Sequence, residues 1–509
     1  MNRRDFILGS SLLLGCAKAG FTAPEAKAIN ASVYRPRVHY APVTGFMNDP
    51  NGLLYYEGEY HLFYQHNPSS ALMGNVHWGH AVSSDLLNWK TLPNALNNTS
   101  SGQAFSGSAV VDKNNSSHLF TDNHGGILLF YTRAGALRQV QELAYSADNG
   151  RTFNHYDRNP IIDINSQQFR DPKVFWYEPN QKWVMVVVQS RNHIVEFYES
   201  DNLRHWEKSG EFKKSGLLGI DYECPDLLAI EVESGKFVWV LLLSINPGAP
   251  LGGSTVQYFV GNFDGRQFTP FDHAARFVDF AKDFYAFQSF SGIEDAPVGL
   301  SWLCNWQYAN QMPATPSRGM MTIPRKLGLL NFRGEWQLTQ QFIDLSSQFN
   351  KTLYNGEKSL DAGGSWTVSL PQGEAVEITL ITDIDVDTIL SLTFANNEGE
   401  SLSIGFDSSA FGGFFIDRHN TNGFDNPYYT DRFSYALPPN TTSTDMHIIL
   451  DNSSIELLAA QGMASGTALY FTRAAFTSLT VHAAGGKGRL SCFRLNTLNP
   501  TSNAYEPFK

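Results

Sequence analysis

The sequence is poor in cysteine and in charge. Four cysteines among 509 residues cannot form a disulfide scaffold. Charged residues make up 17%, which argues against long disordered or coiled-coil segments. With 37 Lys and Arg against 49 Asp and Glu, the net charge is −12, so we expect no general attraction to nucleic acid or anionic membranes. No run of 18 apolar residues occurs, so no membrane span is predicted.

Hydrophobic and aromatic residues, by contrast, are plentiful. Hydrophobic residues make up 42% of the chain and aromatic residues 13%, with 36 Phe, 21 Tyr and 10 Trp. Aromatic side chains favour strands and also line sugar sites. At roughly 150 residues per domain, the length predicts two to four domains.

The N-terminus has the pattern of an export signal. Arg3 and Arg4 precede an apolar run over residues 6–17, which is too short to cross a bilayer and resembles a bacterial twin-arginine signal. We predict that residues 1–28 are removed after Ala28, with 17–19 (AKA) as a weaker cleavage candidate, and that the protein is periplasmic or extracellular. A lipoprotein-like cleavage box ends at Cys16, so attachment of a lipid anchor at Cys16 is an alternative. No disulfide is predicted among the three remaining cysteines, Cys224, Cys304 and Cys492.

From about residue 38 the chain consists of short apolar segments separated by polar turns. Segments such as 126–132, 183–188 and 238–244 are rich in Val, Leu and aromatic residues, and several are apolar throughout, which predicts strands buried on both faces. Four polar turns are each followed by an aromatic residue, and their aspartates, at intervals of 63, 53 and 63 residues, are Asp85, Asp148, Asp201 and Asp264. A period of about 60 residues predicts propeller blades, although such turns occur by chance in every β-protein.

The predicted fold is therefore all-β. We expect a five-bladed β-propeller over residues 35–345. Small and polar residues over 346–365 predict a linker, and alternating strands over 366–509 predict a C-terminal β-sandwich.

Three acidic residues have unusual neighbours. Asp49, Asp171 and Glu223 each lie beside or one residue from a proline, among aromatic or other apolar residues. Proline restricts the residue before it to extended geometry, and apolar surroundings raise a carboxyl pKa. Glycoside hydrolysis needs one carboxylic acid that donates a proton and one carboxylate that attacks. Each motif taken singly is also an ordinary turn former.

These motifs resemble those of a known family. The blocks at 48–52 (NDPNG), 170–172 (RDP) and 223–224 (EC) resemble, in order, the three signature blocks of glycoside hydrolase family 32. Segments 77–83 (HWGHAVS) and 169–179 (FRDPKVFWYEP) resemble its invertase branch. The similarity extends from about residue 38 to near the C-terminus.

The resemblance implies a five-bladed propeller followed by a β-sandwich, and retaining hydrolysis of β-fructofuranosides without metal or cofactor. Asp49 would be the nucleophile, Glu223 the acid/base, and Asp171 the transition-state stabiliser. The carboxyl groups of Asp49 and Glu223 are then expected about 5–5.5 Å apart. We expect Arg170 to keep the neighbouring Asp171 ionised. The implied sugar contacts are Asn48, Gln65, Trp78, Phe105, Ser106, Arg170 and Trp306.

Some positions depart from the family pattern or stay ambiguous. Phe46 and the 72–74 segment, with Met73, stand where the family usually has tryptophan, and Met73 offers no flat stacking face. Trp78 and Phe105 are alternatively core aromatics, and Gln65 alternatively satisfies a buried backbone group. Four clustered histidines lack the spacing of a zinc site and are interpreted as structural or substrate-edge residues: His61, His66, His77 and His80.

Four functions remain open. The first is an invertase-type hydrolase of sucrose and fructo-oligosaccharides. The second is a fructosyltransferase that passes the same covalent intermediate to a sugar. The third is an exo-inulinase or levanase. The fourth is a non-catalytic sugar-binding protein, which predicts a lost catalytic carboxylate, and none is lost. The expected binding partner is a small sugar. Whether the chain forms homo-oligomers through the sandwich is left undecided by the sequence.

Overall fold

The computed structural model describes residues 31–121 and 125–505. In these ranges the chain forms 36 strands and no α-helix. The short 3-10 turns are η1 (Ala31–Tyr34), η2 (Glu178–Asn180), η3 (Ser190–Asn192) and η4 (Ser346–Gln348). The predicted export signal, with Cys16, lies outside the described residues. No helix in the described ranges is long and apolar enough to cross a membrane.

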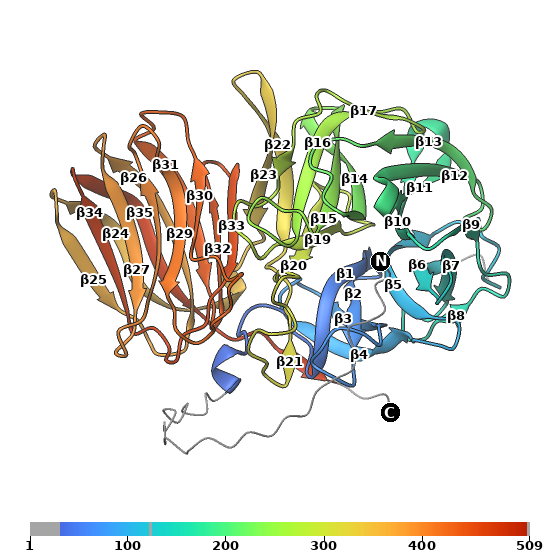
Figure 1. The fold of residues 1–509 in the computed structure, drawn as a ribbon, viewed down its shortest axis with the longest axis horizontal. Helices are drawn as coiled ribbons and strands as arrows, with labels where there is room; N and C mark the ends of the chain where they lie inside the picture. The colour runs from blue at the N-terminus through green and yellow to red at the C-terminus, as the bar shows by residue number, and fades with distance from the viewer. Residues whose placement is uncertain (1–30, 122–124, 506–509) are drawn as a thin grey trace, which may run out of the picture. The chain divides into compact units, whose positions relative to one another are not determined.

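Five sheets follow one another along the chain (Figure 1). Their first strands contact one another in a ring and are β1 (Gly45–Tyr56), β5 (Gln103–Asp112), β10 (Phe169–Tyr177), β14 (Asp221–Glu233) and β19 (Tyr285–Ser289). The outer strands are β2 (Glu59–Asn67), β3 (His77–Ser83), β4 (Trp89–Leu96), β6 (Gly126–Ala134), β7 (Gln139–Ser146), β8 (Asn154–His155), β9 (Ile162–Ser166), β11 (Lys182–Gln189), β12 (Ile194–Ser200), β13 (Glu207–Lys213), β15 (Lys236–Asn246), β16 (Thr255–Phe263), β17 (Phe268–Pro270), β18 (Arg276–Phe277), β20 (Val298–Trp302), β22 (Arg325–Phe332) and β23 (Glu335–Phe342). The predicted propeller is therefore confirmed.

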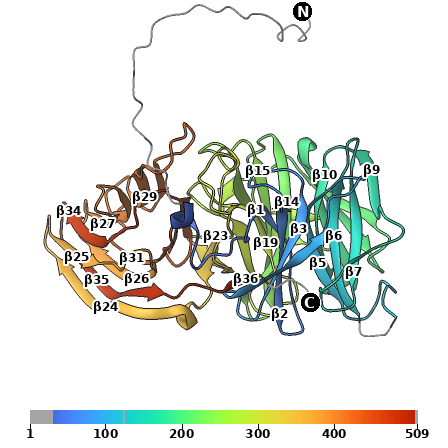
Figure 2. The same cartoon turned by 90° about the horizontal axis from the view of Figure 1, so that it is seen from below.

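The ring is closed between the last and first blades. β21 (Ser317–Arg318) pairs in parallel with β1, and Leu54 bridges to Ser291. β36 (Asn503–Tyr505) returns from the C-terminal end of the chain and pairs with β4 (Figure 2). Residues far apart in sequence thus complete the first sheet.

The aspartate repeat marks one structural position. Its four turns join the third and fourth strands of the first four blades. The carboxylates of Asp85, Asp148 and Asp264 accept hydrogen bonds from backbone N–H groups of their own turns. In the third blade Asn202, rather than Asp201, caps the turn. The wholly apolar segment 183–188 lies in β11, where all five residues over 184–188 are fully buried.

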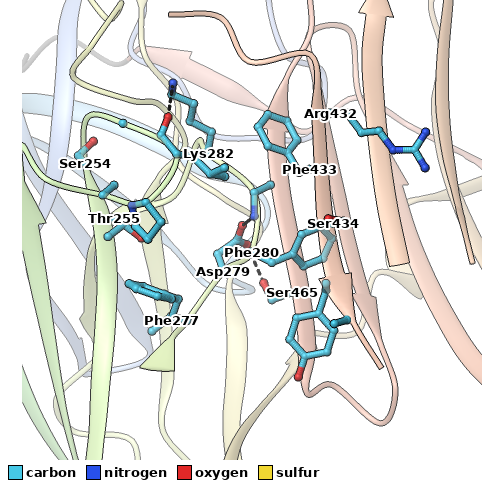
Figure 3. Close-up of a pocket in the computed structure, with 18 of the residues that line it drawn as sticks. Ser254, Thr255, Phe277, Asp279, Phe280, Lys282, Arg432, Phe433, Ser434 and Ser465 are labelled. Atoms are coloured by element: carbon cyan, nitrogen blue, oxygen red, sulfur yellow. Dashed lines mark hydrogen bonds between the residues drawn. The ribbon is translucent and has the colours of Figure 1, made fainter. Parts of the chain in front are cut away.

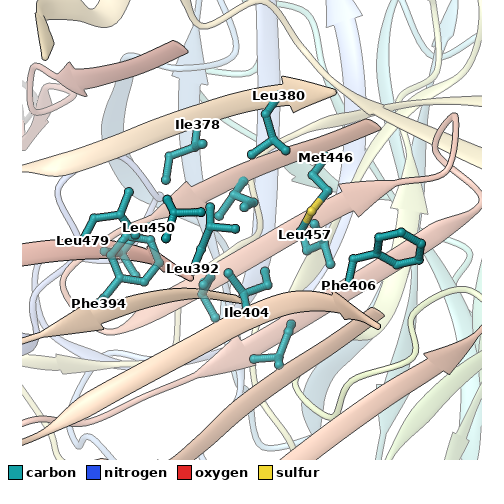
Figure 4. Close-up of a cluster of buried hydrophobic side chains, with 14 of the residues drawn as sticks. Ile378, Leu380, Leu392, Phe394, Ile404, Phe406, Met446, Leu450, Leu457 and Leu479 are labelled. Atoms are coloured by element: carbon teal, nitrogen blue, oxygen red, sulfur yellow. The ribbon is translucent and has the colours of Figure 1, made fainter. Parts of the chain in front are cut away.

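The C-terminal strands form two six-stranded sheets that pack face to face (Figures 1 and 4). The first holds β24 (Phe349–Leu360), β35 (Gly488–Leu498), β26 (Ala375–Ile384), β31 (Ser443–Leu450), β32 (Ser454–Ala459) and β33 (Ala464–Leu469). The second holds β25 (Ser365–Ser369), β34 (Ser478–Ala484), β27 (Ile389–Ala395), β28 (Ser401–Asp407), β29 (Gly413–Asn420) and β30 (Arg432–Ala436). Burial alternates along β27 and β34, as expected for a sandwich.

The segment predicted as a linker, 346–365, differs from that expectation. Most of it is β24, an edge strand that pairs with β35 over 349–360 with three register shifts. Leu360 is the one residue of this strand that is buried, so the apolar alternation that would have predicted a strand is missing.

Candidate active site

All five inner strands are bulged next to the candidate site. The pairing registers shift between Met47 and Pro50, Phe105 and Gly107, Arg170 and Lys173, Glu223 and Asp226, and Tyr285 and Gln288. In a regular strand, consecutive side chains point to opposite faces. A bulge re-aims a side chain. Asn48 with Asp49, and Arg170 with Asp171, therefore line one cavity although they are adjacent in sequence.

The expectation that proline holds its predecessor extended is wrong at Asp171. Its φ is +65°, in the left-handed region, although Pro172 follows. Cys224, before Pro225, has a φ of +46°. The bulges impose this geometry, and each such residue costs of the order of 1–3 kcal/mol. The Asp171 N–H donates to Thr132 Oγ1 (2.9 Å) and the Cys224 N–H to Asp171 Oδ2 (2.9 Å), which hold both residues in place.

Asp49 on β1 is buried among hydrogen-bond donors. Ser106 Oγ (2.7 Å), Gln65 Nε2 (3.2 Å) and Cys224 Sγ (3.3 Å) donate to its Oδ2, and Asn48 Nδ2 (3.1 Å) to its Oδ1. Burial raises the pKa of Asp49 above its ordinary value, while the bonds from Ser106, Asn48 and Cys224 lower it. These donors are all neutral and favour the carboxylate form.

Glu223 on β14 has a different environment. Arg170 donates to its Oε1 from Nε (3.2 Å) and Nη2 (3.1 Å), and the Tyr285 hydroxyl donates to its Oε2. Its side chain is 21% exposed. Burial raises the pKa of Glu223, Arg170 and Tyr285 lower it, and the charge of Asp49 raises it again. The group can therefore hold a proton while remaining close to a cation.

Asp171 on β10 is linked to Asp49 through Cys224, whose thiol contacts both carboxylates. Cys224 contacts Asp171 through both its N–H and its thiol, whose sulfur is 3.7 Å from Oδ2. Burial raises the pKa of Asp171 to about 7, Arg170 opposes the rise, and the charge of Glu223 adds to it. Arg170 lowers the pKa of Asp171, but burial outweighs it, so the expectation that Arg170 keeps Asp171 ionised is not confirmed. The hydrogen bonds of Arg170 go to Glu223, Gln139 and Gln168. The three carboxyls share the Arg170 cation with a fourth, Asp221, whose Oδ2 is 3.7 Å from Arg170 Nη2, so the site favours retention of a proton.

The three acids open into one cavity of about 430 Å³, a size ordinary for a small-molecule site. Eight predicted site residues line it: Asn48, Asp49, Gln65, Phe105, Arg170, Asp171, Glu223 and Trp306. Ser106 contacts Asp49 without being part of the lining.

Trp78 does not line this cavity. It is fully buried, packs against Phe63 and Tyr131, and its Nε1 donates to the carbonyl of Phe105 (3.0 Å). The structure thus places Trp78 in the core, behind a residue of the cavity wall, which was the alternative interpretation of its sequence.

The two departures from the family pattern have different surroundings. Phe46 is buried and stacks on Trp306 with ring centroids 6.1 Å apart, so it supports the wall from behind. Met73 lines the cavity and is 55% exposed. Its backbone N–H donates to Asn310 Oδ1 (2.8 Å), which joins the first-blade loop to the last blade.

Sequence reasoning missed several members of the site. Tyr285 stands in no motif, and no signal in the sequence pointed to it. Cys224 was noted as part of the Glu-Cys block and as an unpaired cysteine, but not as a residue of the site. The cavity also includes Gln307 and the Asn246–Pro247 pair.

The four clustered histidines do not line the cavity either. His61 Nδ1 and His80 Nε2 are 3.0 Å apart in a buried stack with Phe63, and burial lowers the pKa of both histidines. His66 bonds to Asn94. Within 31–121 and 125–505, no group of three or more His, Cys, Asp or Glu side chains could hold a metal ion.

A propeller cavity that pairs a donor-held carboxylate with a proton-holding glutamate has the equipment of a glycoside hydrolase. The chain matches the glycosyl hydrolases family 32 N-terminal domain over residues 39–341 and the family 32 C-terminal domain over residues 340–497. The chain therefore belongs to glycoside hydrolase family 32, as its motifs predicted.

Relatives are similar over most of the chain. Invertase 2 of Saccharomyces cerevisiae is 39% identical, over 89% of this chain and 92% of its own length. An extracellular exo-inulinase of Meyerozyma guilliermondii is 36% identical, over 87% and 91%. The structure of β-fructofuranosidase from Schwanniomyces occidentalis complexed with fructosyl-erythritol has a TM-score of 0.87 and 35% identity, and covers 93% of this chain and 99% of that chain.

Proposed function

We propose that the protein is a retaining β-fructofuranosidase that hydrolyses sucrose to glucose and fructose. The observation that carries the proposal is the contrast between two carboxyl groups of one cavity. Asp49 accepts hydrogen bonds from neutral donors, whereas Glu223 is held by Arg170 and Tyr285. Four hydrogen bonds fix Asp49 in place and favour its carboxylate, whereas Glu223 is partly exposed and burial raises its pKa against the opposing effect of Arg170 and Tyr285, so Glu223 is the group that can exchange a proton.

In the first step a carboxylate oxygen of Asp49 bonds to the anomeric carbon of the fructosyl unit. The bond from that carbon to the glycosidic oxygen breaks, and the proton of Glu223 passes to the leaving glucose oxygen. Asp171 hydrogen-bonds fructose hydroxyls and stabilises the positive charge that develops on the ring. Asn48, Gln65 and the other lining residues orient the sugar.

In the second step Glu223, now ionised, removes a proton from water. The water oxygen bonds to the anomeric carbon and the ester to Asp49 breaks, which restores both carboxyl groups. The partial exposure of Glu223 supports this role, because it allows water to approach. Arg170 limits the affinity of Glu223 for its proton, so the group can release the proton in one step and recover it in the next.

The test is product analysis of purified protein on sucrose beside Asp49→Ala and Glu223→Ala. Equal glucose and fructose from the wild type, lost in both variants, supports the proposal. Excess glucose with growing oligosaccharides favours a fructosyltransferase. Preferential release of fructose from inulin or levan favours a polymer-acting enzyme. A wild type inactive on all three substrates contradicts the assignment.

We also propose that residues 1–28 direct export to the periplasm or beyond. The paired arginines and the apolar run after them support this proposal. Fractionation of cells that carry Arg3→Lys/Arg4→Lys tests it, since retention of the variant in the cytoplasm is expected. A membrane-bound mature form that Cys16→Ala releases would indicate a lipid anchor. Light scattering tests homo-oligomers through the sandwich.

A further inference from the structure

Arg418 is a buried cation at the contact between propeller and sandwich. Arg418 lies on β29 of the sandwich and is 1% exposed. Its guanidinium lies 3.6 Å from the Tyr429 ring, and Nε donates to the Thr430 carbonyl (2.8 Å). Its Nη1 donates to Asp283 Oδ2 (2.9 Å), and Asp283 belongs to the propeller.

Asp283 connects this cation to β19, whose Tyr285 contacts Glu223. The Asp283 carboxylate, fully buried, also accepts from the Leu469 N–H (2.8 Å), and its own N–H donates to the Thr467 carbonyl (3.1 Å). It thus fastens the last blade to β33 of the sandwich. Two residues later comes Tyr285, whose hydroxyl donates to Glu223. Two residues span at most about 7 Å of chain, so displacement of Asp283 reaches Tyr285 directly.

The same carboxylate holds part of the cavity wall. The Tyr308 hydroxyl donates to Asp283 Oδ1 and lies 3.4 Å from Arg418 Nη2. Tyr308 belongs to a turn closed by bonds to the Asn305 carbonyl, and this turn presents Trp306 to the cavity. Arg418 is therefore connected to Tyr285 through Asp283 and the chain that follows it, and to Trp306 through Tyr308 and its turn.

Neighbouring bonds reinforce this attachment. Lys282 Nζ donates to the carbonyls of Leu251 (2.8 Å) and Tyr428 (2.6 Å), and Asp279 accepts from Ser465 Oγ (2.7 Å). Figure 3 shows Lys282, Asp279 and Ser465 where this segment of the propeller meets the sandwich. The bonds to Tyr428 and Ser465 thus attach the segment that leads into β19 to the sandwich.

We propose that the sandwich is a working part of the active site and that Arg418 is its positioning residue. Through Asp283 and Tyr308, Arg418 holds Tyr285 against Glu223 and keeps Trp306 on the cavity wall. The inference rests on the proposed hydrolysis of β-fructofuranosides. It assigns to the sandwich a role in proton transfer and substrate fit, beyond covering the propeller.

The test compares Arg418→Met with the wild type by the pH dependence of kcat/KM on sucrose. Loss of Tyr285 as a donor favours protonated Glu223, so the basic limb moves to higher pH. A fall of about tenfold in kcat/KM is expected from a small misplacement of these groups. KM rises as well, because Trp306 is less firmly held.

His39→Gln is the matched control. His39 is also a fully buried cation between propeller and sandwich, where it bonds to Asp451 (2.8 Å) and Glu456 (2.7 Å), but it contacts neither Asp283 nor the Tyr308 turn. The His39→Gln substitution should lower thermal stability and leave the pH profile of kcat/KM unchanged. Tyr308→Phe is the milder variant if Arg418→Met does not fold, and it should shift the basic limb in the same direction.

The outcomes separate the two proposals. A wild type without activity on any fructoside refutes the proposed function. An active wild type, with Arg418→Met or Tyr308→Phe retaining its basic limb, kcat and KM, refutes the positioning role. The inference also fails if His39→Gln shifts the profile as far as the Arg418 variant does, because general loosening of the junction would then explain both.

Discussion

The hydroxyl of Ser106 should help set the pH at which the enzyme becomes active. It donates to Asp49 Oδ2 over 2.7 Å, and both groups are buried. A hydrogen bond to a charged group contributes about 1.5–3 kcal/mol, and one pKa unit corresponds to about 1.36 kcal/mol. Ser106→Ala would then raise the pKa of Asp49 by about one to two units. Because Asn48, Gln65 and Cys224 still donate, we expect the lower value.

The sign follows from which form the bond stabilises. Ser106 favours the Asp49 carboxylate, so its removal makes the group hold its proton to higher pH. Asp49 must be ionised to attack, and the acid limb of kcat/KM for sucrose hydrolysis should therefore move up by about one pH unit. Below that limb, activity should fall about tenfold, whereas on the plateau the loss should be smaller.

Ser108→Ala provides the control on the same strand. Ser108 is equally buried on β5, but its oxygen accepts from the Val174 N–H (2.9 Å) and touches no carboxylate. Its loss should reduce stability and leave both limbs in place. If the acid limb of Ser106→Ala coincides with that of the wild type and of Ser108→Ala, the role of this hydrogen bond is refuted.

Three further predictions concern the acid/base, the junction and the core. Tyr285→Phe removes a donor that lowers the pKa of Glu223, so the basic limb of kcat/KM should move up by about one unit; an unchanged limb would exclude the contact from the mechanism. Burial lowers the pKa of His39, but bonds to Asp451 and Glu456 outweigh it and raise the pKa to about 9. Protonated His39 therefore stabilises the folded state by about 3 kcal/mol, fully below pH 6.5 and no longer once the pH has risen through 9. In urea unfolding, the wild type should lose this free energy of unfolding between those pH values, and His39→Gln should not. Leu392→Ala empties a fully buried position and should cost 2–5 kcal/mol in urea unfolding, and a cost near zero would contradict the packing.

The blades were predictable because the same kind of capped turn recurs between the third and fourth strands of successive blades. Capped turns such as that at Asp148 satisfy backbone donors with a side chain nearby in sequence, so a short motif suffices to find them. The fifth copy, over 331–336 (NFRGEW), was missed because it has no aspartate. Its Asn331 Oδ1 nevertheless accepts from the Gly334 N–H (3.0 Å). β24 was missed because it is an exposed edge strand, and its sequence therefore lacks the apolar alternation that predicts a strand.

The active site was only partly predictable. Asp49, Asp171 and Glu223 lie in compact motifs, and each motif supports its residue locally. The partners of these acids come from other blades: Tyr285 reaches Glu223 across 62 positions of sequence. Such contacts depend on the closure of the ring and on the bulges, which no local pattern encodes. The core position of Trp78 was undecidable for the same reason.

The central claim is that Asp49 carries the fructosyl group between the two steps. A β-fructoside with a good leaving group needs no acid for the first step, whereas the second step needs Glu223 as base. Incubation of Glu223→Ala with such a substrate should therefore add one fructosyl unit to the protein. Peptide mass mapping should find that unit on Asp49, and Asp49→Ala/Glu223→Ala should remain unmodified. An adduct on any other residue, or none while free fructose is released at the wild-type rate, would contradict the account.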